Sequence, residues 1–444
     1  MMSFRSYSVL PKTVLESPHT NQENRPGEQG EYNLTTHDRR YVIIGNGVAG
    51  TTAAETLRKN DPNCSIQLFT NEPHPLYNRV SLPRFLQGVI TEQKVMIRDF
   101  AWHEQRNIQL QTETFITDVN TDERAVVTDK GQILPYDALL VATGGWANPL
   151  RVPGAKDLKH IYNFVTLDDT KTIIERMLES RTALAYGGSF ISYELCDGFA
   201  VRKLNTTWLM RGPYWLRSSL DPEGGEVVDN IAKKFGVEVI HGDEIECIIP
   251  NNGVPGYVKT KKGREIQTDM IGVGLGITLN TQFLATTPIE VRQGLVVNEY
   301  LETNVPDVYA AGDIAEFFDL TVDEHHTMGT WDNALAHGRI AGVNMAGGRQ
   351  AYVDVPTYTS PLFDVNIAVV GTAEANNPEL ESIALREPGE KGNENYRKLF
   401  FRENKLVGVL MIGSPKGRKK LVEIVKNQQV FETPAERETL LRLK

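Results

Sequence analysis

A glycine motif placed between a strand and a helix constrains the fold of this chain more than any other feature. The unit consists of an apolar strand at 41–44, Gly45, Gly47 and Gly50, a helix-like stretch at 51–60 and a second strand at 65–69. The first glycine permits a tight turn, the second lets a pyrophosphate approach the backbone, and the third lets the helix pack closely on the strand. The helix N-terminus then faces the phosphates with its partial positive charge. The motif therefore predicts a βαβ unit on a parallel sheet, with a dinucleotide at its edge.

The same pattern returns 142 residues later, with Gly187 in the place of Gly45. The second unit consists of a strand at 182–186, Gly187, Gly188 and Ser189, a helix to about residue 203 and a strand at 207–210. Apolar strands at 138–142 and 271–276 follow the two units, and the first of these strands runs into Thr143 and Gly144. An internal repeat of this length predicts two tandem Rossmann-like dinucleotide-binding domains, which is an α/β fold.

The composition excludes several other classes of protein. Of the 444 residues, 40 % are hydrophobic and 23 % are charged, which excludes a largely disordered chain. A net charge of −10 argues against a nucleic-acid binder, and no apolar run reaches the roughly 18 residues that a membrane span needs. Cys64, Cys196 and Cys247 stand far apart, which excludes a cysteine-based metal site and fits the cytoplasm. His325 and His326 are adjacent, so their side chains diverge; we expect them in a loop and expect no metal.

Further segments resemble the motifs of one flavoprotein superfamily. They are 76–84, similar to a Tyr-x-Arg-x-x-Leu-Ser-Lys segment, 304–313, similar to a second FAD motif, 331–347, similar to a helix that caps the flavin, and parts of 396–413, similar to a C-terminal domain of nitrite reductases. Over about residues 39–430, the chain resembles the FAD oxidoreductases of the pyridine nucleotide–disulfide reductase superfamily. The resemblance is to the rubredoxin and ferredoxin reductases, apoptosis-inducing factor and the FAD part of assimilatory nitrite reductases.

The resemblance implies the order of the domains. We predict an FAD-binding domain in two pieces, 39–152 and 275–350, split around an NAD(P)-binding domain at 153–274. Alternating strands after that point predict a C-terminal α+β interface domain at 351–444. Residues 1–38 are polar and aperiodic, and we expect them to form a flexible arm.

The resemblance also implies residues that bind FAD. Asp313 would hydrogen-bond the ribityl chain, and the helix that starts near Trp331 would aim its N-terminus at the flavin pyrimidine ring. Arg79 would meet the diphosphate or the flavin edge, unless it is a surface cation. Glu72 is the only acid available to read the ribose, and its alternative is a surface carboxylate. The predicted FAD set is Gly45, Gly47, Gly50, Glu72, Arg79, Thr143, Gly144, Gly312, Asp313 and Trp331.

The second glycine motif departs from the superfamily. Ser189 and Ser192 stand where glycine is usual, but a hydroxyl can donate to a phosphate, so we keep Gly187 and Ser189 as nucleotide contacts. The acid that would read NADH falls near Met210, and Arg211 follows it, which favours NADPH over NADH. Two alternatives stay open: Arg211 is a solvated cation, or the domain no longer binds a nicotinamide.

A candidate catalytic pair is also carried over from the ferredoxin-reductase branch, where a Lys–Glu ion pair lies beside the flavin. The matching positions are Arg84 and Glu194, and the alternative is that both are ordinary surface or helix residues. Arginine does not lend a proton, so Arg84 would have an electrostatic role. Ser81 stands near the position where related oxidases carry a thiol, so thiol and peroxide chemistry are disfavoured.

These features predict an FAD-dependent NAD(P)H oxidoreductase that passes electrons to an external ferredoxin or rubredoxin without a redox disulfide. Residues 415–444 carry eight Lys or Arg and four Glu, a basic patch that could steer an acidic partner or be a solvated helix face. The alternatives are a quinone or small-acceptor reductase of the same fold, or a non-catalytic FAD-bearing subunit. The sequence leaves a homodimer open.

Overall fold

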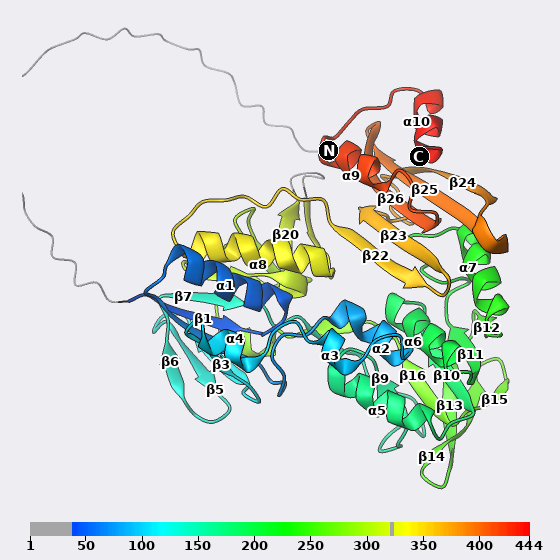
Figure 1. Ribbon diagram of the computed structural model, residues 1–444, viewed down its shortest axis with the longest axis horizontal. Coiled ribbons are helices and arrows are strands. Elements are labelled where there is room, and N and C mark those ends of the chain that lie inside the picture. Colours follow the sequence, from blue (N-terminus) through cyan, green and yellow to red (C-terminus); the bar gives the residue numbers. More distant parts are fainter. Residues whose placement is uncertain (1–37, 320–323) are drawn as a thin grey trace, which may run out of the picture. The chain divides into compact units, whose positions relative to one another are not determined.

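The computed structural model describes residues 38–319 and 324–444, and its first layer is a five-stranded parallel sheet (Figure 1). Its strands, in spatial order, are β19 (Val308–Ala310), β7 (Ala138–Val141), β1 (Arg40–Ile44), β2 (Ser65–Phe69) and β3 (Ile108–Gln111). The central strand β1 is buried from Tyr41 to Ile44, as expected of a parallel strand that is covered on both faces. The helix predicted at 51–60 begins earlier, because α1 spans Val48–Asn60.

Two helices lie side by side over this sheet, α1 and α8 (Trp331–Met345) (Figure 1). They approach closely because α8 carries glycines at the contact. A Cβ on Gly338 would stand 2.2 Å from the carbonyl oxygen of Ala49, and one on Gly342 would stand 2.7 Å from the Cβ of Thr56. This packing fixes the N-terminus of α8 relative to the first glycine motif.

A second parallel sheet repeats the arrangement of the first. Its strands are β12 (Glu238–His241), β11 (Asn205–Met210), β10 (Thr182–Tyr186), β16 (Met270–Val273) and β9 (Ile161–Asn163), and its helices are α5 (Leu167–Met177), α6 (Phe190–Val201) and α7 (Pro222–Lys234). The two sheets confirm the predicted α/β fold with tandem Rossmann-like units.

The chain passes between the two sheets at a short antiparallel ribbon. It leaves after β7 along β8 (Gly145–Ala147) and returns along β17 (Ile277–Leu279), and these two strands pair with each other. The last strand of the first sheet, β19, therefore follows the whole second sheet in sequence. This order supports the predicted insertion, while the limits at 152 and 275 remain a prediction.

Smaller elements surround the two sheets. Each parallel sheet is accompanied by a three-stranded antiparallel meander, the first made of β4 (Ile116–Asn120), β5 (Ala125–Thr128) and β6 (Ile133–Pro135), and the second of β13 (Ile245–Asn251), β14 (Val254–Thr260) and β15 (Glu265–Gln267). Another three-stranded sheet consists of β18 (Leu295–Val297), β20 (Ala315–Asp319) and β21 (Glu324–Thr327). The short helices are α2 (Leu82–Leu86), α3 (Glu92–Val95) and α4 (Phe100–Glu104). The loop predicted for His325 and His326 is wrong, because both residues lie on β21, where His326 Nε2 is 3.0 Å from Asp319 Oδ2.

The last part of the chain is an antiparallel sheet with two helices, as predicted from its alternating pattern. The strands are β22 (Thr357–Leu362), β23 (Val365–Gly371), β26 (Lys405–Gly413), β25 (Glu394–Arg402) and β24 (Glu381–Pro388), and the helices are α9 (Arg418–Lys426) and α10 (Pro434–Leu441). Leu421, Ile424 and Val425 are buried and hold α9 against its own sheet.

Candidate functional site

The first glycine of the motif has a backbone conformation that only glycine adopts readily. Gly45 has φ +113°, and a Cβ on it would lie 2.2 Å from the carbonyl oxygen of Ala142. A Cβ on Gly50 would lie 1.9 Å from the carbonyl oxygen of Gly45, so this glycine lets α1 pack on β1. A Cβ on Gly47 would meet no described atom within 4 Å. The two outer glycines thus shape the turn, and the middle one leaves open space beside the backbone.

The N-terminus of α1 opens onto this space. Gly47 is the N-cap, no described side chain caps the helix there, and the first turn holds no acid. The first N–H groups of a helix lack acceptors within the helix, so they can bind an anion. An open position at the start of an uncapped helix fits a phosphate group.

A cavity of about 450 Å³ lies at the carboxyl ends of β1, β2 and β7. Gly45, Asn71 and Thr143 line it, so two predicted FAD residues share this cavity. Phe115 and Trp146 also line it, with their rings stacked at 6.3 Å between centroids. No sequence pattern predicts this aromatic pair, because Phe115 lies between β3 and β4 and Trp146 lies on β8.

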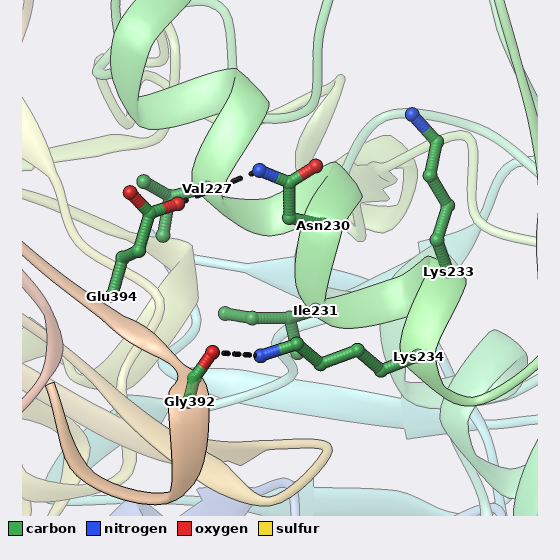
Figure 2. A pocket seen from close by; sticks show the side chains of 7 residues that line it. All are labelled: Val227, Asn230, Ile231, Lys233, Lys234, Gly392 and Glu394. Carbon is green, nitrogen blue, oxygen red and sulfur yellow. Dashed lines mark hydrogen bonds between the residues drawn. The ribbon is translucent and has the colours of Figure 1, made fainter. Parts of the chain in front are cut away.

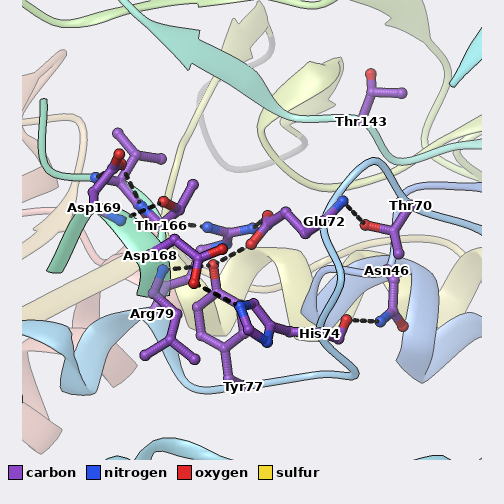
Figure 3. A network of polar contacts seen from close by, with 12 residues as sticks. Asn46, Thr70, Glu72, His74, Tyr77, Arg79, Thr143, Thr166, Asp168 and Asp169 are labelled. Atoms are coloured by element: carbon purple, nitrogen blue, oxygen red, sulfur yellow. Dashed lines mark hydrogen bonds and ion pairs between the residues drawn. The ribbon is translucent and has the colours of Figure 1, made fainter. Parts of the chain in front are cut away.

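Glu72 is part of a polar network rather than of this cavity lining (Figure 3). Its carboxylate accepts a hydrogen bond from Tyr77 Oη at 2.6 Å and forms an ion pair with Arg79. The Arg79 guanidinium also donates to the carbonyl oxygen of Val165 at 2.8 Å. One carboxylate oxygen of Glu72 therefore contacts Tyr77 and the other contacts Arg79, so in this geometry Glu72 orients the Arg79 guanidinium. The predicted contact of Glu72 with the ribose remains a prediction.

Asp313 lies beside the start of α8. A Cβ on Gly329 would stand 3.2 Å from Asp313 Oδ2, and α8 begins two residues further on at Trp331. Burial raises the pKa of Asp313, and the positive charge of Arg79 opposes this rise. The structure thus brings Asp313, Arg79 and the N-terminal end of α8 together, which the resemblance predicted as three separate contacts.

His337 supports this turn from the inner face of α8, and sequence reasoning missed it. Its Nδ1 accepts a hydrogen bond from the Gly312 N–H at 3.3 Å, and its ring packs edge-on against Phe317 and Tyr352. Burial lowers the pKa of His337 to about 3, so the ring is neutral and Nδ1 is free to accept. The imidazole thereby fixes the backbone that precedes Asp313.

The second glycine motif keeps its turn despite the two serines. Gly187 has φ +134°, and a Cβ on it would lie 2.1 Å from the carbonyl oxygen of Gly274. Ser189 Oγ donates to that same carbonyl at 2.9 Å, and Ser192 Oγ donates to the carbonyl of Ser189 at 2.7 Å. The fold satisfies both hydroxyls. No described side chain caps α6 at Ser189, so its N–H groups can still receive a phosphate.

The structure does not bring Arg84 and Glu194 together. Arg84 is exposed on α2 and, within the described residues, is in no ion pair. Glu194 Oε1 accepts instead from Tyr358 Oη at 3.3 Å, a residue of the C-terminal sheet. Burial raises the pKa of Glu194 to about 8 and that of Asp197, one turn later, to about 7. The predicted ion pair is therefore corrected to a half-buried acid beside a tyrosine. The predicted roles of Arg84 and Glu194 at the flavin remain predictions.

The other candidate residues and cavities lie apart from the first glycine motif. Arg211 is exposed at the carboxyl end of β11. A second cavity, of about 440 Å³, lies between α7 and the turn before β25, where Lys234 Nζ donates to the carbonyl oxygen of Gly392 (Figure 2). In residues 38–319 and 324–444 no group of three or more His, Cys, Asp or Glu could hold a metal ion. Over the same residues, none of the helices is long and apolar enough to cross a membrane.

Comparison with known proteins identifies related chains. Residues 39–338 match the model of the pyridine nucleotide-disulphide oxidoreductase family, and residues 361–429 match the rubredoxin NAD+ reductase C-terminal domain. The nitrite reductase [NAD(P)H] of Bacillus subtilis is 29 % identical over 397 residues, which are 89 % of this chain. The chain spans about half the length of that relative, 48 %.

Two further similarities extend over nearly whole proteins. The NADH-rubredoxin oxidoreductase of Clostridium acetobutylicum is 24 % identical over 90 % of this chain and 98 % of its own. The reductase in a crystal structure of a covalent putidaredoxin reductase–putidaredoxin complex has a TM-score of 0.83 and 21 % identity, over 90 % of this chain and 95 % of its own. The family match covers more than half of the chain and both glycine motifs, so the chain belongs to the pyridine nucleotide-disulphide oxidoreductase family, whose members bind FAD and NADH or NADPH.

Proposed function

We propose that this chain is an FAD-dependent NAD(P)H oxidoreductase that passes electrons to an external redox protein of the ferredoxin or rubredoxin type. The observation that carries the proposal is the pair of glycine turns, each at the start of a helix that no described side chain caps. Two such sites in one chain suit a flavin dinucleotide and a nicotinamide dinucleotide. Two relatives of this chain are named as a nitrite reductase and an NADH-rubredoxin oxidoreductase.

The residues of the first site fit FAD. The open space at Gly47 and the start of α1 suit the pyrophosphate, and the stacked rings of Phe115 and Trp146 offer a flat apolar surface to an adenine. Asp313 and Arg79 would hold the ribityl and diphosphate groups. Bound FAD accepts a hydride from a nicotinamide and passes electrons on singly.

The cysteines support a route that uses the flavin alone. Cys64, Cys196 and Cys247 are all free, and the first two are buried. Burial raises the pKa of Cys64 to about 11 and that of Cys196 above its usual range, so both remain thiols at neutral pH. A thiol that stays protonated is a poor nucleophile, so neither Cys64 nor Cys196 suits thiol–disulfide exchange. We propose that the electrons pass to an external acceptor instead.

The first turn of α9 favours a protein as that acceptor. Lys419 and Lys420 are exposed there beside Arg418, and this turn contains no acid. Cations at a helix N-terminus oppose the helix dipole, at a cost of roughly 0.3–1 kcal/mol each. A cluster kept against this cost suits an acidic partner better than a neutral quinone. We propose that the protein acts in the cytoplasm, as a monomer or as a homodimer.

A spectroscopic titration tests the proposal. The purified protein should show a flavin spectrum, which NADH or NADPH should bleach in the absence of oxygen. Oxidised rubredoxin or ferredoxin should then restore the flavin band and become reduced itself. A yellow protein that responds to neither nucleotide would instead support a non-catalytic FAD-bearing subunit. Recovery with a quinone but with neither protein would support the small-acceptor alternative.

A further inference from the structure

Tyr358 of the C-terminal sheet contacts the start of α6, the helix whose N–H groups would receive the nucleotide phosphates. Tyr358 lies on β22, and its ring centroid is 4.3 Å from that of Phe190, the first residue of α6. Its Oη donates to Glu194 Oε1 at 3.3 Å. Phe190 and Glu194 are four residues apart, so they lie on one face of the helix. A single side chain of the last sheet therefore contacts the first residue of α6 and the residue one turn later.

Trp215 holds Phe190 from a second direction. The two ring centroids are 5.4 Å apart with the rings edge to face, and Trp215 Nε1 donates to the carbonyl oxygen of Ser189 at 3.0 Å. Ser189 is the N-cap of α6, and no described side chain caps the helix there. Tyr358 and Trp215 thus fix the start of α6 from two other parts of the chain. A site that is held rigid before its ligand arrives loses less entropy on binding.

Other contacts dock the C-terminal sheet more firmly than Tyr358 does. The buried Tyr193 donates from Oη to the carbonyl oxygen of Pro361 at 2.8 Å, and the sheet shares a hydrophobic core with α6. On α7, Asp221 accepts from Tyr396 Oη at 2.6 Å. Tyr358 is only half-buried, and its hydrogen bond is the longest of these three. Docking alone therefore gives little reason for a tyrosine at position 358.

The charge of Glu194 depends on the same contact. Burial raises the pKa of Glu194 to about 8, and the hydrogen bond from Tyr358 opposes this rise. The groups that face its carboxyl are Tyr358 and Ser360 of β22, and Tyr193 and Asp197 of α6, none of which is a cation. Glu194 is therefore mostly neutral at pH 7 and becomes a carboxylate as pH rises through about 8. Only the carboxylate would repel a phosphate at the start of the helix.

We propose that Tyr358 is a positioning residue for the nicotinamide dinucleotide, because it fixes Phe190 and Glu194 at the start of α6. The inference rests on the proposed function and adds the C-terminal sheet to its donor site. The ring of Tyr358 holds Phe190 by packing, and the hydroxyl holds the Glu194 carboxyl by a hydrogen bond. The two contributions can be separated, because Tyr358→Phe removes the hydroxyl and Tyr358→Leu removes both.

The first test measures flavin reduction in the holoenzyme, without oxygen, as a function of NADH and NADPH concentration. We expect Tyr358→Leu to raise the half-saturating concentration of both nucleotides by roughly tenfold, because the aromatic contact is lost, and to keep the limiting rate within about twofold. Tyr358→Phe keeps the ring, so at pH 7 the change should stay within about threefold. The matched control is Tyr396→Phe, which also removes a hydrogen bond between the C-terminal sheet and an acid of a neighbouring helix. It should leave the half-saturating concentrations unchanged.

The second test is the pH dependence of NADH binding. In wild type the affinity should fall as pH rises through about 8, because Glu194 becomes a carboxylate near the bound phosphates. The hydrogen bond from Tyr358 favours the carboxylate, so Tyr358→Phe should raise the pKa of Glu194 and move the fall to higher pH. Glu194→Gln should abolish the fall. A side chain that only supports the fold would not shift this profile.

Calorimetry with NAD+ and NADP+ separates this inference from the proposed function, because it needs no flavin reduction. If neither NADH nor NADPH bleaches the flavin while the oxidised nucleotides bind more weakly to Tyr358→Leu than to wild type, the proposed function fails and the role of Tyr358 stands. That role is overturned by an unchanged half-saturating concentration in Tyr358→Leu, by an equal loss in Tyr396→Phe, or by one pH profile for wild type and Tyr358→Phe. The absence of any nucleotide binding would overturn both.

Discussion

Gly47 is the position at which one side chain should separate cofactor binding from folding. Its φ of −73° is ordinary, and the space around its α carbon is open. We expect Gly47→Val to fold with a loss of roughly 1 kcal/mol from the poorer N-cap. FAD affinity should fall at least about tenfold, because the side chain would occupy the pyrophosphate position. The measurements are the FAD content of purified protein and the melting temperature of the flavin-free form.

The same variant has an outcome that would contradict the site. A Gly47→Val protein that purifies with a full complement of FAD would place the pyrophosphate elsewhere. Gly50→Val makes the contrast, since its side chain would collide with the carbonyl of Gly45 and should disturb the fold itself. Gly47→Val should thus lose FAD while keeping its fold, whereas Gly50→Val should lower the stability of the fold itself.

Single residues also show what the sequence could and could not predict. Gly45 and Gly50 were predictable because their roles depend on a local turn that the motif specifies. The partner of Glu194 was not, since Tyr358 is 164 residues away in the chain and only the packed fold joins them.

At the scale of elements, α6 carries a half-buried acid, Glu194, and a buried one, Asp197, on the face that meets its neighbours. Glu194 contacts Tyr358 of β22, and Asp197 accepts from Gln87 Nε2, just after α2, at 2.8 Å. Burial raises the pKa of both, to about 8 and about 7. In the unfolded chain these acids ionise near pH 4, so the folded state retains protons that the unfolded state has released. Stability should therefore be greatest below pH 4 to 5 for these two groups and be lost as pH rises through 7 to 8.

Thermal unfolding of the flavin-loaded protein between pH 5 and 9 measures this effect. We expect Glu194→Gln to flatten the fall of the melting temperature with pH, because glutamine stays neutral throughout. Glu175→Gln, an exposed acid on α5, should leave the profile unchanged. Parallel profiles for wild type and Glu194→Gln would show that Glu194 is ionised in the folded protein.

The order of elements was more predictable than their contacts. Apolar runs next to glycine turns predicted the inner strands of both parallel sheets, since burial on two faces leaves a strong signal. The shorter, less buried strands β3, β9 and β12 at the sheet edges were not predicted. β21 was missed because Glu324–Thr327 is short and polar, and its pairing with β20 comes from tertiary contact rather than from its own sequence. The start of α1 was placed late because glycine and valine at its first positions weaken the local helix signal.

At the scale of the whole molecule, the first turn of α9 is basic although the chain as a whole has a net charge of −10. Several cations of 415–444 are already paired, including Lys426 with Asp354 at 2.9 Å and Arg437 with Glu381 at 2.6 Å. Those left at the start of α9 should steer an acidic partner, and salt should weaken the effect as the Debye length falls from about 10 Å at 0.1 M to about 3 Å at 1 M.

Partner reduction at these two salt concentrations measures this steering. Lys419→Glu with Lys420→Glu should lower the rate of ferredoxin or rubredoxin reduction roughly tenfold at low salt and remove most of its salt dependence. Lys156→Glu with Lys159→Glu changes the charge equally at exposed positions before β9 and should have little effect. Flavin reduction by the nucleotide should be unchanged in both. A rate indifferent to salt in wild type would make the α9 cations an ordinary solvated surface.

The ribbon of β8 and β17 has a consequence for how such a chain can evolve. Gly145 pairs with Leu279 and Ala147 pairs with Ile277, so the insertion begins and ends at one place. A segment whose two ends meet can be exchanged by recombination without stretching the sheet it interrupts. The second glycine turn, which lies in the insertion, and the first glycine turn outside it are therefore separately heritable. A lineage could replace one reductant with another while its flavin site and its acceptor surface descended unchanged.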